Sequence, residues 1–97
     1  MAAYILLCNL TDQGARAIKE APQRRRAARE LAKSCGVEMK EVYLAIGPYD
    51  LVIHMDAPND DALATFLLSL SSQGNVRTMT LKVFGETEYD QILKGVV

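Results

Sequence analysis

The segment AIGPYDLVIHMD, residues 45–56, holds the side chains of this 97-residue chain that are best suited to chemistry. His54 is the only histidine, and imidazole is the side chain whose unperturbed pKa allows proton transfer near neutral pH. Asp56 follows two positions later, so on a strand both side chains would point to the same side as a pair of metal ligands. A stable metal site needs three or four protein donors, and we predict none here. His54 is then either a candidate acid or base, or a strand histidine packed against a hydrogen-bonding partner.

The corner between the two apolar runs, Gly47-Pro48-Tyr49-Asp50, has two interpretations. Pro48 pre-sets the backbone for a tight turn, Gly47 lets the chain bend, and Asp50 can accept hydrogen bonds from turn amides. Turn chemistry alone explains Gly47 and Asp50. For Tyr49 two interpretations stay open: the ring covers the sheet edge, or the phenol stands at the mouth of a binding cavity while Asp50 fixes the loop or the ligand.

Cys8 and Cys35 are the only cysteines, and neither belongs to a CxxC pair. The N-terminus lacks the features of a secretory signal, and no run approaches the ~18 apolar residues of a membrane span, so we expect a cytoplasmic location with reduced thiols. A disulfide framework or cysteine-rich zinc site is not expected. Cys8 could face His54 if the first and third strands are neighbours, although lone cysteines in apolar runs are mostly small core residues.

These side chains must be positioned by strands and helices that alternate along the chain. The apolar run at residues 3–9 predicts a strand, and Thr11 or Asp12 can then cap a helix. That helix is expected to end at Gly36, with a kink or break at Pro22, which lacks an amide hydrogen.

Period-two alternation predicts further strands over residues 37–46, 51–56 and 76–84, with the first two joined as a hairpin. Residues 58–61 signal a second helix, because a polar residue can cap it and its acids favour the helix start. A short helix closes the chain. The buried stripe of the second long helix is expected to be Leu63, Phe66, Leu67 and Leu70.

The order β-α-β-β-α-β plus a C-terminal helix predicts one α+β domain over residues 1–97, ferredoxin-like, with a four-stranded antiparallel sheet. Both long helices would cover one face and leave an open face. Alternation assigns to the helix-covered face Leu44, Leu51, Ile53, Met55, Leu81 and Val83. It assigns to the open face Met39, Tyr43, Val52, His54, Thr78, Thr80 and Lys82. The first strand is apolar on both sides, so its two faces are left unassigned.

An open face of this mixed polarity is too apolar to be only solvated and too polar for a dry core. A sheet-to-sheet dimer of the dimeric α/β-barrel type, enclosing a partly polar cavity, would satisfy both tendencies. Such a cavity is where a small ligand would bind. The candidate ligand-binding residues are Tyr43, Tyr49, Asp50, His54, Thr78 and Lys82.

The strongest positive run is RRRAAR, residues 24–29, and it could bind phosphate or nucleic acid. Glu20 and Glu30 flank it, no aromatic residues interleave with it, and the formal net charge of the chain is −1. We therefore interpret the run as a solvated helix face and expect neither nucleic acid nor membrane as a partner.

The stretches YLAIGPYDLVIHMDAPND and GNVRTMTLKVF, with the short C-terminal helix, resemble the GYD domain family of small bacterial and archaeal proteins. The likeness covers essentially the whole chain. The Gly-x-Tyr-Asp corner is also similar to that in the ligand-binding domain of Lrp/AsnC-type regulators. The second resemblance implies dimers and higher assemblies that bind small effectors such as amino acids. This chain has no helix-turn-helix domain, so the resemblance does not extend to direct regulation of transcription.

Three hypotheses follow. The leading one is a non-catalytic homo-oligomer that binds a small molecule at the open face and needs no cofactor. The second is an enzyme resembling the cofactor-independent monooxygenases, isomerases or haem-degrading proteins of the dimeric α/β-barrel group, in which His54 would be the base or a haem ligand and Tyr43 and Tyr49 would orient substrate. The third is a purely structural assembly unit whose open face is filled by its partner.

Overall fold

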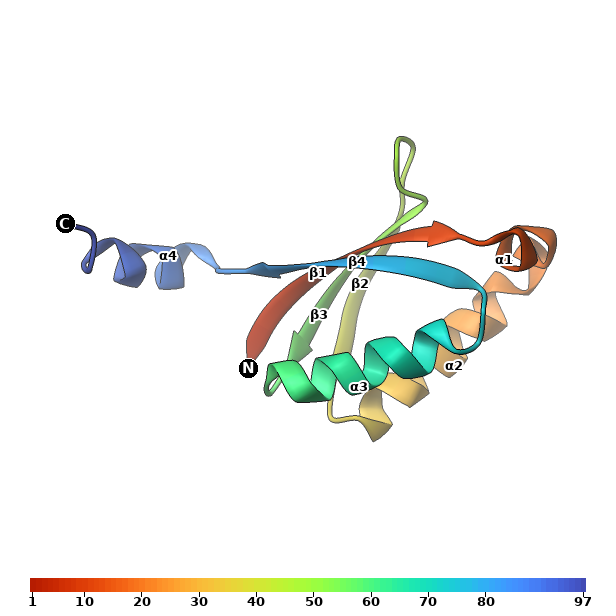
Figure 1. Ribbon diagram of the computed structural model, residues 1–97, viewed down its shortest axis with the longest axis horizontal. Coiled ribbons are helices and arrows are strands. Elements are labelled where there is room, and N and C mark those ends of the chain that lie inside the picture. The colour runs from red at the N-terminus through yellow and green to blue at the C-terminus, as the bar shows by residue number, and fades with distance from the viewer.

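Four antiparallel strands form one sheet in the order β2-β3-β1-β4, so the first strand of the chain lies in the interior of the sheet (Figure 1). A computed structural model describes residues 1–97. The elements are β1 (Ala2–Leu10), α1 (Asp12–Arg16), the 3-10 helix η1 (Ile18–Glu20), α2 (Ala21–Ser34), β2 (Glu38–Leu44), β3 (Leu51–Ala57), α3 (Asp60–Ser71), β4 (Val76–Val83) and α4 (Glu86–Leu93). The predicted α+β, ferredoxin-like order is confirmed.

The helices α2 and α3 cover one face of the sheet, and the other face carries no helix (Figure 1). The core lies in the layer between helices and sheet, because alternate residues of β1 and β3 point into it. The largest fully buried side chains are Phe66, Leu6, Met55, Val37 and Cys8. None of the helices has the combination of length and apolar character needed to cross a membrane.

The segment before β2 is broken into three pieces and is not one helix. The break, η1, precedes Pro22, which lies in the first turn of α2, where its missing amide hydrogen costs nothing. Thr11 caps α1 by accepting a hydrogen bond from the Gly14 amide at 3.1 Å. The chain leaves α2 through Gly36, whose φ of +76° suits glycine. The predicted cap, break and stop are therefore confirmed, with the break a few residues early.

The predicted second long helix corresponds to α3, which begins at the cap Asn59. The Asn59 side chain accepts a hydrogen bond from the Ala62 amide at 2.8 Å. Of the predicted apolar stripe, Leu63 and Phe66 are buried and Leu67 and Leu70 pack partly buried against the core.

A bulge in β2 corrects the predicted position of Met39. Met39 pairs with Met55 and Val42 with Ile53, so two residues, Lys40 and Glu41, lie opposite one residue of β3. One extra residue reverses the alternation, which moves Met39 to the helix-covered face, where only 9% of it is exposed. The prediction that Met39 lies on the open face was wrong.

The two faces of β4 are the reverse of those predicted. Its pairing with β1 sets Thr78 beside Cys8, Thr80 beside Leu6 and Lys82 beside Tyr4, all on the helix-covered side. Leu81 and Val83 lie on the open face instead. The prediction failed because it placed the more apolar side of β4 under the helices, whereas β4 is an edge strand whose apolar side faces away from them.

The other assignments are confirmed by the strand register. Leu51, Ile53 and Met55 lie on the helix-covered face, and Leu44 pairs with Leu51 on that side. The residues found on the open face are Ala3, Ile5, Leu7, Asn9, Glu38, Tyr43, Val52, His54, Asp56, Arg77, Met79, Leu81 and Val83. This set is called the open face below.

Candidate functional site

His54 lies on the open face, within a small charged group. Its Nε2 atom is 3.7 Å from Asp56 Oδ1, and the Lys40 ammonium is 2.8 Å from Asp56 Oδ2. The hydrogen bond and charge of Asp56 raise the pKa of Lys40. Because Lys40 already balances the carboxylate of Asp56, that carboxylate is poorly placed to serve His54 alone. No group of three or more histidine, cysteine, aspartate or glutamate side chains is arranged in the structure so that it could hold a metal ion.

Cys8 does not face His54. Its side chain lies on the helix-covered side of β1 and is buried, whereas the residue of β1 paired with His54 is Ile5. Burial raises the pKa of the Cys8 thiol to about 11, so the thiolate is scarce at neutral pH. The thiol–imidazole pair considered from the sequence was wrong.

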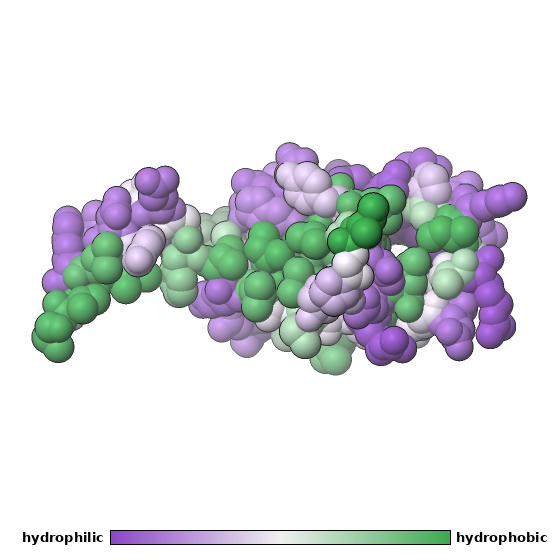
Figure 2. All heavy atoms as spheres, turned by 90° about the horizontal axis from the view of Figure 1, so that it is seen from above, coloured by the Kyte–Doolittle hydropathy of each residue, from purple (hydrophilic) through white to green (hydrophobic).

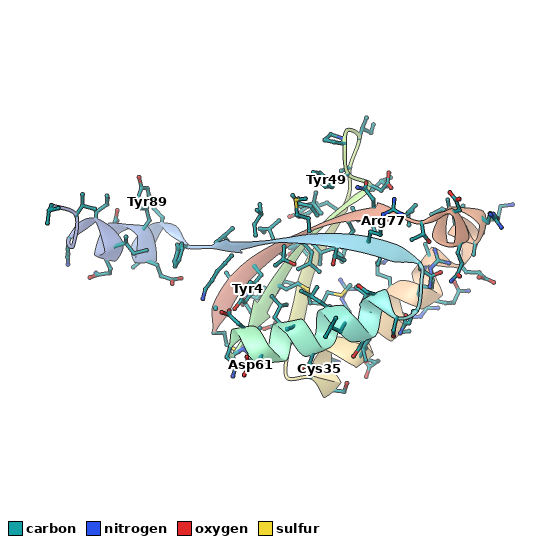
Figure 3. All side chains as sticks on the ribbon, in the orientation of Figure 1. Tyr4, Cys35, Tyr49, Asp61, Arg77 and Tyr89 are labelled. Atoms are coloured by element: carbon teal, nitrogen blue, oxygen red, sulfur yellow. The ribbon has the colours of Figure 1, made fainter.

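The corner that contains Tyr49 is a loop over residues 45–50 and not a two-residue turn. Gly47 has a φ of +145°, a conformation that glycine adopts readily. Tyr49 is half-buried, and its hydroxyl donates a hydrogen bond to the Met79 sulfur at 3.4 Å, which places its phenol at the open face. Figure 3 shows Tyr49 on the same side of the sheet as Arg77.

Asp50 fastens this loop to β1. Its carboxylate accepts a hydrogen bond from the Leu10 amide at 2.9 Å, and its own amide donates to the Cys8 carbonyl at 2.9 Å. The Asp50 carbonyl accepts from the Ala45 amide at 2.9 Å, closing the loop. The prediction that Asp50 accepts amides of the turn was wrong, because its carboxylate accepts the Leu10 amide of the neighbouring strand β1.

We expect Asp50→Ala to destabilise the protein by about 1–3 kcal/mol, because the half-buried Leu10 amide would lose its charged acceptor. Asp50→Asn is the matched control, since its amide oxygen can still accept that hydrogen bond. Urea unfolding of the three proteins measures the difference. Equal stability of the alanine and asparagine variants would contradict the assigned contact.

Lys82 belongs to a contact network on the helix-covered face. Its ammonium is 3.5 Å from Asp60 Oδ1 and 6.0 Å from the centre of the Tyr4 ring. The Tyr4 hydroxyl donates to the same carboxylate. This hydrogen bond, with the nearby charge of Lys82, lowers the pKa of Asp60, and the same bond raises the pKa of Tyr4. The network joins β1, β4 and the start of α3, and neither Lys82 nor Thr78 lies beside His54.

The lowered pKa of Asp60 predicts a loss of stability in acid. A carboxyl group whose folded-state pKa lies below its unfolded value stabilises the protein above the unfolded pKa, and the effect is lost as pH falls through the folded pKa. We expect Tyr4→Phe to lower the Tm by a few degrees at pH 7 and to flatten its fall below about pH 4. Thermal melts from pH 3 to 7 test this expectation. If the Tm of both proteins falls in parallel as the pH is lowered, the Tyr4 hydrogen bond does not lower the pKa of Asp60.

A cavity of about 130 Å³ lies beneath the helices, on the side of the sheet opposite to His54. Its lining is mostly apolar and includes Phe66, Ile53 and Leu10, while Arg25 and Asp50 are among its few polar residues. Engineered cavities of ~150 Å³ hold benzene, so this space suits a small apolar group. The sequence did not predict this cavity, because part of its lining, Ile18 and Ala21, comes from η1 and α2. Their position over the sheet is known only from the structure.

The arginine run is partly engaged by the backbone of the same chain. Arg24 donates to the carbonyls of Ala17 at 2.6 Å and Gly14 at 3.3 Å. Arg29 donates to the carbonyls of Met39 at 3.4 Å and Lys40 at 3.3 Å, and so supports the β2 bulge. Arg25 and Arg26 are exposed, as expected for a solvated helix face, whereas Arg24 and Arg29 are half-buried and held by the backbone, which corrects that interpretation for these two residues.

The open face itself is a further candidate binding surface. Figure 2 looks onto it and shows a hydrophobic band over the sheet that continues toward the C-terminal segment. Tyr43 is 56% and Met79 55% exposed, and Leu81 is also exposed. Contiguous exposed apolar surface on a small protein usually marks an interaction site.

Comparison with solved structures supports the fold. The crystal structure of MtbAldR matches with a TM-score of 0.68 at 19% identity, covering 88% of this chain and 52% of MtbAldR, so this chain spans about half of that protein. The crystal structure of hypothetical protein PHS023 from Pyrococcus horikoshii matches with a TM-score of 0.57 at 19% identity, covering 89% of this chain and 93% of PHS023. At these identities the likeness shows the fold alone.

Two relatives from Thermus thermophilus match the chain more closely in sequence. TTHA0845, known from a crystal structure, has a TM-score of 0.57 and 25% identity, covering 88% of this chain and 95% of that one. A protein named glutamine synthetase and cystathionine beta-lyase binding protein is 37% identical over 83 residues, which are 84% of this chain and 87% of the relative. The GYD domain model matches residues 4–93. With nearly its whole length matched, the chain belongs to the GYD domain family.

Proposed function

We propose that this chain is a cytoplasmic, non-catalytic binding protein that self-associates through its open face and takes enzymes as protein partners. The observation that carries the proposal is the exposed apolar surface around Tyr43, Met79 and Leu81, on a face that no helix covers. The choice of enzymes as partners is supported by the relative that is 37% identical, which is named as a binding protein of glutamine synthetase and cystathionine beta-lyase.

The chemistry of the polar side chains supports binding over catalysis. His54 has no positioned partner beyond Asp56, and Asp56 is closer to Lys40 than to His54. Cys8 is buried and lies on the opposite side of the sheet. A general acid or base needs a positioned reaction partner, and a nucleophile needs an adjacent base. We therefore expect His54→Ala to retain partner binding.

Purified enzymes test the proposed partners. The protein is mixed separately with glutamine synthetase and with cystathionine beta-lyase from its own source organism, and complexes are detected by size-exclusion chromatography with light scattering. We expect co-elution with at least one enzyme, retained by His54→Ala. Failure to bind either enzyme, from a protein that native mass spectrometry shows to be a folded oligomer, would contradict the enzyme-partner part of the proposal.

Small-molecule binding is a second candidate function, and the cavity under the helices favours it. The space is small and mostly apolar, with Arg25 in the lining to meet a polar group on the ligand. At the open face, Tyr43, Tyr49 and His54 stay proposed ligand residues. Native mass spectrometry of freshly purified protein, followed by denaturation, tests for a retained ligand. Titration of a broad metabolite panel with no heat at any concentration would count against this second function.

A further inference from the structure

The C-terminal arm, residues 84–97, extends beyond the end of β4 away from the body of the molecule (Figure 1). The molecule is 51 Å long but only 18 Å across its thinnest dimension. No residue of α4 is buried. Isolated helices shorter than ~12–15 residues are marginal in water, and α4 has eight residues. The helix therefore needs a surface that stabilises it.

The arm has one apolar side. Tyr89, Ile92, Leu93 and Val96 recur at the three- and four-residue spacing of a helix face, and each is exposed. Acidic side chains occupy other positions, namely Glu86, Glu88 and Asp90. Figure 2 shows this division as hydrophobic atoms along one edge of the arm and hydrophilic atoms along the other.

The open face has the complementary properties. It offers exposed Met79 and Leu81 to an apolar helix side, and it carries Arg77, which is exposed and forms no ion pair within the chain. The arm of the same chain points away from this face along the direction of β4 (Figure 1). A second copy carries the same exposed apolar face and the same Arg77, so it offers the arm the surface that its own chain does not.

We propose that the arm of each copy packs its Tyr89, Ile92 and Leu93 side onto the open face of a second copy. Reciprocal exchange of the two arms forms a closed, two-fold dimer, since the same surfaces are buried on both subunits. Glu86, Glu88 and Asp90 then approach the partner's positive charge at Arg77. The inference rests on the proposed self-association and names the segment that carries it.

Hydrogen exchange of the α4 amides tests the arm directly on the unsubstituted 97-residue protein. The measurement is made at concentrations about tenfold above and about tenfold below the dissociation constant of the oligomer, so that bound and free subunits are compared. We expect protection of α4 only at the higher concentration. Protection of α4 at both concentrations would mean that the arm packs on its own chain. Absence of protection at both concentrations would mean that the arm packs on no surface. Each of these results overturns the inference.

A double variant supplies the second test. Ile92→Glu with Leu93→Glu is expected to weaken self-association at least about a hundredfold, because two charges would enter the apolar contact. Gln91→Glu is the matched control: it adds a charge to the same helix off its apolar side and is expected to change the dissociation constant by less than about threefold. These residues are outside the core, so folding of the body should be unchanged. If the double variant associates like wild type while Met79→Asp is monomeric, the arm does not carry the contact. Self-association through the open face would then stand without the arm.

Discussion

Met79→Asp is expected to convert the oligomer into a monomer, with self-association weakened at least about a hundredfold. Met79 is 55% exposed on the open face and is the residue that the Tyr49 hydroxyl contacts. An aspartate there would have to lose its hydration within an apolar contact when the face is covered, which costs several kcal/mol. Sedimentation velocity across a concentration series measures the change.

The control for Met79→Asp is Leu68→Asp, on α3. Leu68 is 73% exposed and apolar, but it lies on the helix layer, on the other side of the molecule from the open face. The same new charge there is expected to leave the oligomer intact. Far-ultraviolet circular dichroism should show both variants folded, because neither position is buried. A folded Met79→Asp protein that still associates like wild type would show that the open face does not carry the interface.

The elements of this fold could be predicted because their signals are local in sequence. Thr11 and Asn59 cap the helices as expected, since a cap needs only a side-chain oxygen and an amide three residues later. Gly36 ends α2 because a positive φ suits glycine. Such interactions are complete within a few residues, so one sequence suffices to find them.

The faces of the strands were harder to predict, because alternation defines two sides without saying which side is covered. The bulge at Lys40 and Glu41 moved the Met39 side chain to the other face of the sheet. Nothing local in that stretch of sequence signals an extra residue. On β4, Leu81 belongs to the apolar side yet faces away from the helices. Assigning the apolar side to the core assumes that the core lies within one subunit, whereas an interface between subunits has the same composition.

The contacts of the candidate site depend on partners far apart in the sequence. Asp50 could be expected to bind an amide, but the identity of Leu10 follows only from the neighbouring strands. The contact between Tyr4 and Asp60 joins residues 56 positions apart. It could not be predicted, because both sides of the first strand are apolar and the face on which Tyr4 lies was left unassigned. The cavity was missed for the same reason, since it arises between layers and not within any one element.

Phe66 links the stability of the fold to this cavity. Only 1% of its side chain is exposed, and it lies in the core cluster while also lining the cavity. Truncating a buried ring removes its transfer free energy and leaves a larger empty space, because the surrounding helices and sheet relax only partly. Small apolar molecules can occupy such a space and stabilise the folded state in proportion to their binding.

Phe66→Ala is therefore expected to lower the free energy of unfolding by about 3–5 kcal/mol, a large share of the ~5–15 kcal/mol typical of a domain. Leu68→Ala, on the exposed side of the same helix, should change it by less than about 0.5 kcal/mol. Phe66→Leu keeps most of the volume and allows the comparison if the alanine variant does not fold. Urea unfolding gives the three values, and thermal melts with and without benzene test the enlarged cavity.

We expect benzene to raise the Tm of Phe66→Ala more than that of the wild type, because the larger space fits it better. A small stability loss with no response to benzene would mean that the helices close over the site, and the cavity would then lose its value as a candidate ligand site.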